Sequence, residues 1–98
     1  MSRNEVIERL RKNADAIRGM GAVSLYLFGS AARGDAHSDS DLDLFIDYDP
    51  SRRFSLIDLV GIKQFLEEKM STEIDITTRD SLHPMLKADI ERSAVRVF

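Results

Sequence analysis

Two aspartates of this chain stand in a pattern that suits a divalent metal ion. Asp41 and Asp43 belong to the run 41–47, in which acids alternate with branched aliphatic residues. Successive side chains of a strand point to opposite faces, so the two acids share one face and the aliphatic residues the other. Because Asp is depleted in strands, this pairing favours a role in chemistry. Hard carboxylate oxygens suit Mg²⁺, which commonly takes one or two carboxylates plus substrate phosphates.

A third carboxylate follows the same alternation later in the chain. Ile74 and Ile76 are expected to point to the core, while Glu73 and Asp75 point away. This segment can pair beside the run 41–47, which would bring Asp75 near the first two acids. Glu73 is the second candidate on that face. The structural alternative for Asp75 is a polar residue on an exposed sheet face.

A segment that suits phosphate binding precedes the two acids in the sequence. An apolar run ends at Gly29-Ser30, and a turn rich in small residues follows. Backbone N–H groups in such a turn can approach an anion closely, and a helix that begins there adds its N-terminal dipole. Arg33 offers a planar fork of donors that fits phosphate oxygens. The sequence therefore predicts a phosphate-binding turn next to the metal site.

Three other motifs are excluded by single positions. Gly29 and Gly34 have the spacing of a Walker A loop, but Asp35 stands where that motif requires Lys. A calcium-binding loop that starts at position 39 would have Leu44 where Gly is needed and Pro50 where Glu is needed. The chain also lacks Gly-x-Gly-x-x-Gly, so it carries no dinucleotide-binding fingerprint.

The remaining pattern resembles the nucleotidyltransferase superfamily that includes DNA polymerase beta. The matching segments are Phe28-Gly29-Ser30 and, after a spacer, Asp41-Leu42-Asp43-Leu44. The segment Ala32-Arg33-Gly34-Asp35, together with Ser40, is similar to the minimal nucleotidyltransferases within that superfamily. The resemblance covers nearly the whole chain and implies a nucleotidyltransferase fold.

The resemblance also implies a set of site residues and a reaction. The implied metal-binding and catalytic residues are Asp41, Asp43 and Asp75, and the implied nucleotide-binding residues are Gly29, Ser30, Arg33 and Ser40. Two Mg²⁺ ions would serve the transfer of a nucleoside monophosphate, AMP from ATP, to a hydroxyl acceptor. One ion activates the acceptor hydroxyl, and the other stabilises the leaving pyrophosphate. Asp75 is also a candidate to take the hydroxyl proton.

Larger members of the superfamily carry a further domain that helps to bind the acceptor or the base, and 98 residues leave no space for one. A partner or a second copy of the chain is therefore expected to complete the site. In the minimal subgroup the usual partner is a helical HEPN toxin, which is adenylylated on tyrosine. Two alternatives stay open: an antitoxin that acts by binding alone, and an antibiotic nucleotidyltransferase.

Composition restricts the remaining possibilities. A length of 98 residues, with 43% hydrophobic and 32% charged residues, is typical of one soluble domain, here 1–98. The absence of cysteine excludes disulfides and thiolate zinc sites. The net charge of −3 makes a nucleic-acid partner unexpected. No apolar stretch approaches membrane length, and we expect a cytoplasmic protein.

The expected scaffold is α/β (α+β), with a small mixed sheet and helices packed mainly on one face. The periodicity predicts a helix to about position 18, strands at 22–28, 41–47 and 73–78, and an edge strand near 95–98. A short helical turn is expected at 30–33. A capping signature at 55–58 and another at 80–84 predict two more helices. Val23 shares an apolar strand face with Leu25 and Leu27, and the apolar helical stripes, which are expected to pack on the sheet, include Leu56, Val60, Met85 and Leu86.

Overall fold

The computed structural model describes residues 2–34 and 42–98. Its strands are β1 (Ala22–Phe28), β2 (Leu42–Tyr48), β3 (Ile74–Thr78) and β4 (Val95–Arg96). Its helices are α1 (Arg3–Lys12), α2 (Ala14–Gly19), α3 (Gly29–Arg33), α4 (Leu56–Met70) and α5 (Lys87–Ser93), with a 3-10 helix η1 (Arg79–Ser81). The strands form one sheet in the order β3-β2-β1-β4.

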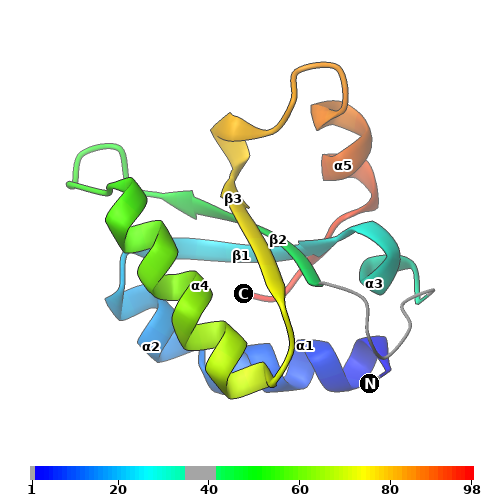
Figure 1. Cartoon of the computed structure of the whole chain (residues 1–98). Helices are drawn as coiled ribbons and strands as arrows, with labels where there is room; N and C mark the ends of the chain where they lie inside the picture. Colours follow the sequence, from blue (N-terminus) through cyan, green and yellow to red (C-terminus); the bar gives the residue numbers. More distant parts are fainter. Residues whose placement is uncertain (1, 35–41) are drawn as a thin grey trace.

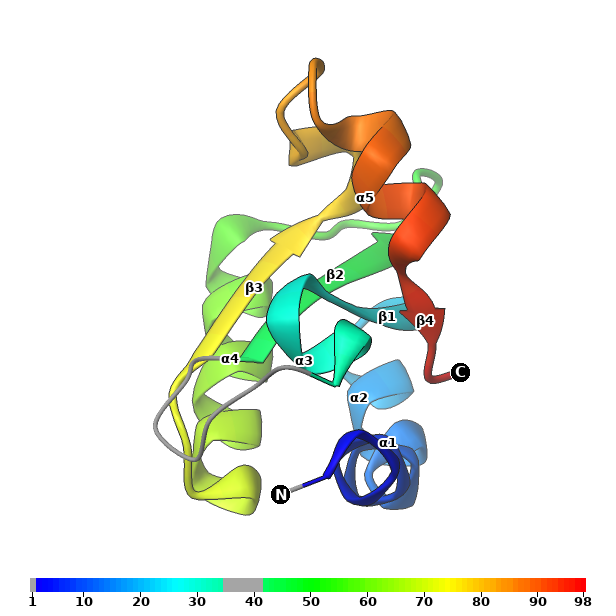
Figure 2. The ribbon, with the colours of Figure 1, turned by 90° about the vertical axis from the view of Figure 1, so that its right-hand side faces the viewer.

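The sheet is mixed, as expected. β1 is antiparallel to both β2 and β4, whereas β2 and β3 are parallel. The parallel pair needs a crossover connection, and α4 provides it. α1, α2 and α4 lie on one side of the sheet and α5 on the other (Figures 1 and 2). The predicted fold class, with helices mainly on one face, is confirmed.

The main core lies between the sheet and α1, α2 and α4. The aliphatic face of β2 is buried there, and so are Ile74 and Ile76 of β3. α4 begins with the predicted capping box, in which Ser55 and Asp58 each bind the other's backbone N–H. Loss of such a cap typically costs about 1 kcal/mol. The core thus fixes the strands that carry the predicted acids.

The first predicted helix is divided in two. α1 ends at Lys12, and α2 starts at Ala14 after a break at Asn13, whose side-chain amide donates to the Arg9 carbonyl at 2.9 Å. Asn favours such side-chain to backbone bonds over a continuing helix. The apolar stripe alone could not show this break, because its spacing continues across Asn13.

Several residues that the sequence assigned to the core are exposed. A register shift between Ala22 and Ser24 turns Val23 outward, so that its exposed fraction is 54%. On α4, the exposed fraction of Leu56 is 73%, and Val60 is also exposed, because only part of the wide apolar stripe faces the sheet. These three assignments were wrong.

The C-terminal region differs from the prediction in a similar way. The segment that starts at Asp80 forms only η1 and a turn, and α5 begins at Lys87. Met85 and Leu86 lie in the turn before α5 and are exposed. The expected edge strand forms as β4, which pairs with the middle of β1. Within the described residues, no helix is long and apolar enough to cross a membrane.

Candidate active site

The register of β2 and β3 brings two of the predicted acids together. Asp43 is the direct partner of Asp75 in the parallel pair. Paired residues on neighbouring strands project to the same face, about 4.8 Å apart along the hydrogen-bonding direction. Asp43 is half-buried and Asp75 is exposed. Asp41 and Ser40, which the sequence also assigns to the site, lie outside the described residues.

The glycine of the predicted phosphate turn lies against one of these acids. Gly29 has a φ of 74°, a left-handed conformation that other residues adopt at a cost. A Cβ atom on Gly29 would overlap Oδ2 of Asp43 and would stand 3.2 Å from its Cγ. The preceding residue, Phe28, is the β1 partner of Asp43. The turn and the acid therefore form one compact site that requires glycine at this position.

The predicted short helical turn is confirmed as α3, which starts at Gly29 and carries Ser30 and Arg33. Ser30 is half-buried, and Arg33 is exposed at the end of the helix. The inner residues of α3 are buried against the sheet. Arg3 of α1 also holds α3, because its Nη1 donates to the Ala32 carbonyl at 3.3 Å. α3 is thus attached to two parts of the fold.

The donors present at this site suit magnesium. Asp43 and Asp75 supply carboxylate oxygens on one sheet face, and the absent side chain of Gly29 lets the Asp43 carboxylate lie against the turn. These are the hard ligands that Mg²⁺ accepts in small number alongside phosphate oxygens. Glu73, the second candidate, is exposed just before β3. Within residues 2–34 and 42–98, no three acids or histidines cluster closely enough to form a complete metal cage.

A second cluster on the same sheet face was not predicted. Arg79 binds both carboxylate oxygens of Asp47, with Nε to Oδ1 at 2.7 Å and Nη2 to Oδ2 at 3.0 Å. Its Nη1 donates to Oε2 of Glu91 on α5 at 2.6 Å. The sequence placed Asp47 on this face but gave no signal for the rest of this cluster, Arg79 and Glu91, which are 32 and 44 positions further along the chain. Only the fold joins them.

The environment of Asp47 is that of an ionised, paired carboxylate. Burial acts to raise the pKa of Asp47, but hydrogen bonds from Arg79 and Ser24 and the nearby positive charges outweigh it, so the pKa lies below its usual value. Ser24 is itself buried and donates to Oδ2 at 2.6 Å. The hydrogen bond to Asp47 in turn raises the pKa of Arg79.

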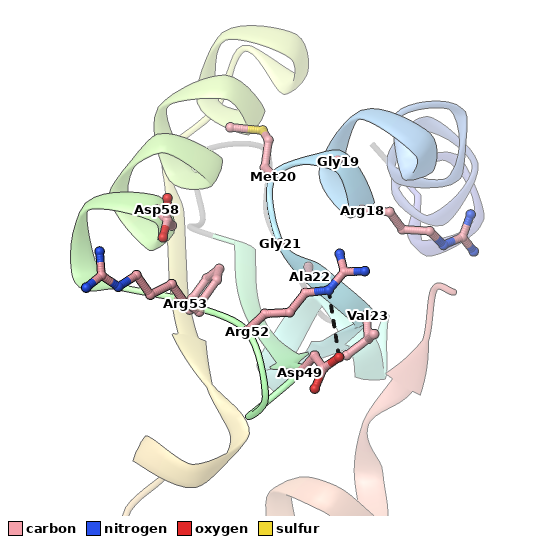
Figure 3. A pocket seen from close by; sticks show the side chains of 11 residues that line it. Arg18, Gly19, Met20, Gly21, Ala22, Val23, Asp49, Arg52, Arg53 and Asp58 are labelled. Carbon is pink, nitrogen blue, oxygen red and sulfur yellow. Dashed lines mark ion pairs between the residues drawn. The ribbon is translucent and has the colours of Figure 1, made fainter.

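A large cavity lies at the other end of the strands, away from the predicted acids. It has a volume of about 640 Å³ and is lined by the α2–β1 turn, the β2–α4 loop and the first turn of α4. Arg18, Arg52 and Arg53 border it, but their guanidinium groups point in different directions (Figure 3). Arg52 makes only a long ion pair with Asp49, at 3.9 Å. These arginines do not converge on one ligand position.

The chain has recognisable relatives among known proteins. Residues 4–97 match the family model described as nucleotidyltransferase domain. A protein of Methanocaldococcus jannaschii, provisionally named a protein adenylyltransferase, is 38% identical over 78 residues, which cover 80% of this chain and 82% of that protein.

Solved structures show the same fold. One described provisionally as a minimal nucleotidyltransferase superposes with a TM-score of 0.72 at 35% identity, covering 91% of this chain and 93% of its own. A Shewanella oneidensis complex, described as a tri-AMPylated HEPN toxin with an MNT antitoxin, gives a TM-score of 0.60 over 98% of this chain and 68% of that chain. Its identity of 19% makes it a likeness of fold. The family that the sequence resembled is thereby confirmed, and the chain belongs to the nucleotidyltransferase domain family.

Proposed function

We propose that this chain transfers AMP from ATP to a hydroxyl group of a partner protein, in a magnesium-dependent reaction. The observation that carries the proposal is the contact of three elements at one point. Asp43 lies beside its strand partner Asp75 and against Gly29. A metal-binding acid pair and a phosphate-binding turn are the two parts that nucleotidyl transfer needs. We also propose that residues 1–98 act as one minimal nucleotidyltransferase domain.

Two sets of residues have different roles in this reaction. Backbone N–H groups at Gly29 and Ser30, with the Arg33 guanidinium, bind the triphosphate. Asp43 and Asp75, with Asp41, hold Mg²⁺, and Ser40 belongs to the nucleotide-binding set. Bound Mg²⁺ supplies charge neutralisation and makes the acceptor hydroxyl more acidic.

The chemical step is an in-line displacement at the α-phosphorus. The acceptor oxygen forms a bond to that phosphorus, and the bond from it to the oxygen that bridges to the β-phosphate breaks. Pyrophosphate leaves with the bonding electrons. Asp75 accepts the proton of the acceptor hydroxyl, which its exposed position permits.

The relatives support a protein as the acceptor. The 38% identical relative is named for adenylyl transfer to protein, and the Shewanella complex pairs the same fold with an AMPylated HEPN toxin. We therefore propose a HEPN-type toxin as the partner and a tyrosine as its acceptor. The face that carries Asp75 is open to such a partner, because that residue is exposed.

The test is to incubate the purified chain and its HEPN-type partner with ATP and Mg²⁺, and to measure the intact mass of the partner. We expect the mass to rise by adenylate units and pyrophosphate to appear. An ATP analogue that cannot be cleaved between the α- and β-phosphates should give no modification. Asp43→Asn and Asp75→Asn should abolish it, whereas Asp15→Asn, an exposed acid of α2, should not.

One result would replace the proposal. If the partner keeps its original mass while its toxicity is silenced at a stoichiometric ratio, the chain acts by binding alone. In that case Asp43→Asn would neutralise the partner as well as the wild type does. Loss of modification in the absence of Mg²⁺, restored when the ion is added, separates metal dependence from the rest of the proposal.

A further inference from the structure

Arg79 occupies a central position on the sheet face that carries the proposed site. It follows β3 directly, and its guanidinium binds Asp47 on β2 through two hydrogen bonds and Glu91 on α5 through a third. These bonds use both edges of the planar fork, and lysine cannot reproduce this geometry. One side chain thus joins β2, β3 and α5.

The same guanidinium lies over an aromatic layer that leads to the phosphate turn. Its Cζ atom is 4.8 Å from the ring centroid of Tyr26 and 5.0 Å from that of Phe45. Phe45 is fully buried and also packs against Phe28, with ring centroids 5.7 Å apart. Phe28 immediately precedes Gly29. An unbroken series of contacts therefore runs from Arg79 to the turn.

A second connection runs through α5. This helix contacts both β1 and α3, and Figures 1 and 2 show it directly above α3. Because Glu91 on α5 binds Arg79, the guanidinium also fixes where α5 stands against α3. Both connections end at the phosphate turn, but the side chains that make them, those of Arg79, Glu91, Phe45 and Phe28, are not proposed ligands of magnesium or phosphate. Arg79 therefore acts on the site only through its neighbours.

We propose that Arg79 is a positioning residue for nucleotidyl transfer, which holds the turn at Gly29 at a fixed place relative to Asp43 and Asp75 through Phe45, Phe28 and α5. This inference depends on the proposed function. A small displacement of the turn still allows the triphosphate to bind. It misaligns the α-phosphorus with the attacking oxygen, and such misplacements can cost up to about 100-fold in rate.

The test is Arg79→Lys, which keeps the positive charge but loses the fork. We expect kcat to fall by about tenfold, while the dissociation constant for ATP changes by less than about threefold. The measurements are made at a temperature at which circular dichroism shows the variant fully folded. Glu91→Gln, which removes the charge but keeps a hydrogen-bond acceptor, should give a smaller loss. The double variant should lose less than the product of the two single losses, because both act on one network.

Arg11→Lys is the matched control. Arg11 also donates from Nε to a backbone carbonyl, that of Val97, in a partly buried hydrogen bond of 2.9 Å, but it does so from α1. This substitution should lower the melting temperature and leave kcat unchanged. If Arg79→Lys likewise lowers the melting temperature and leaves kcat unchanged, Arg79 has only a structural role and the inference is wrong.

A readout without catalysis separates this inference from the proposed function. Hydrogen exchange of the amides in α3 and α5 should accelerate in Arg79→Lys and not in Arg11→Lys. If the wild type transfers no nucleotide but this exchange pattern is found, the proposed function fails while the positioning of α3 by Arg79 stands. Unchanged exchange in both helices would overturn the positioning.

Discussion

Asp43 and Asp47 lie on the same face of the same strand, four residues apart, and their surroundings differ. Asp47 is bound by Arg79 and Ser24, and its pKa lies below the usual value. Asp43 stands next to another acid, Asp75, and against the Cα atom of a glycine.

The difference separates a structural acid from an acid with a proposed role in chemistry. A paired and hydrogen-bonded carboxylate contributes to stability in its ionised form. Two carboxylates side by side on one sheet face can share a divalent cation. The same residue type therefore stabilises the fold at one end of β2 and, on our proposal, serves a reaction at the other.

The strongest test of this contrast compares the two acids directly. Asp43→Asn should chiefly reduce transfer, by about 10³-fold or more, a loss typical of central catalytic groups. Asp47→Asn should cause a much smaller loss of transfer, but it should lower the free energy of unfolding. Kinetics and urea unfolding of both variants provide the check. Similar losses of transfer in the two would remove the distinction.

The second prediction concerns the glycine against Asp43. Gly29→Ala should lower transfer by about 100-fold, because the new Cβ would displace the carboxylate. Gly34→Ala is the matched control, since Gly34 has a nearly identical φ of 77° but no atom of the described residues within 4 Å of the position that a Cβ would take. Both variants should lose about 1 kcal/mol of stability from backbone strain. Only Gly29→Ala should lose activity, as measured by initial rates.

The third prediction compares arginines at the two ends of the sheet. Arg33→Ala should weaken the binding of a non-hydrolysable triphosphate by about tenfold, the size of one charge-assisted hydrogen bond. Arg53→Ala, at the opposite end, should not change it. Ser30→Ala should weaken triphosphate binding less than Arg33→Ala does if backbone N–H groups do most of the binding. Titration calorimetry measures the affinity of each variant for the triphosphate. Equal affinities for wild type and Arg33→Ala would mean that Arg33 is an exposed arginine with no role in triphosphate binding.

The smallest expected effect is a pH dependence at Asp47. Because its pKa is lower in the folded state than the usual value of about 3.9, its stabilisation is present above that value and is lost as the pH falls through the folded pKa. The free energy of unfolding of the wild type should therefore exceed that of Asp47→Asn by about 1 kcal/mol at pH 7. This is a modest amount, because the pair of Asp47 and Arg79 is partly exposed. In acid unfolding, the two free energies should converge at a pH below the folded pKa of Asp47. A constant difference down to that pH would show that Asp47 contributes through packing alone.

The comparison between α4 and β3 shows where sequence patterns succeed. The strict alternation of β3 placed Ile74 and Ile76 in the core and Asp75 outside, as observed. On α4 the apolar stripe is wider than the surface it can cover. Leu56 and Val60 therefore point to solvent although their spacing is helical. A strand has two distinct faces, whereas the surface of a helix is continuous. How much of the helix surface is buried therefore depends on what packs against it.

The sequence by itself determined the family, the order of the main elements and the motif residues, because these depend on residue types at short spacing. The pairing of Asp43 with Asp75 depends on the parallel register of β2 and β3, which alternation favours but does not specify. The network of Asp47, Arg79 and Glu91 was decided by tertiary structure alone. Charged residues distant in the chain carry no local signal of their partner, and only the packing of α5 on the sheet brings these three within hydrogen-bond distance.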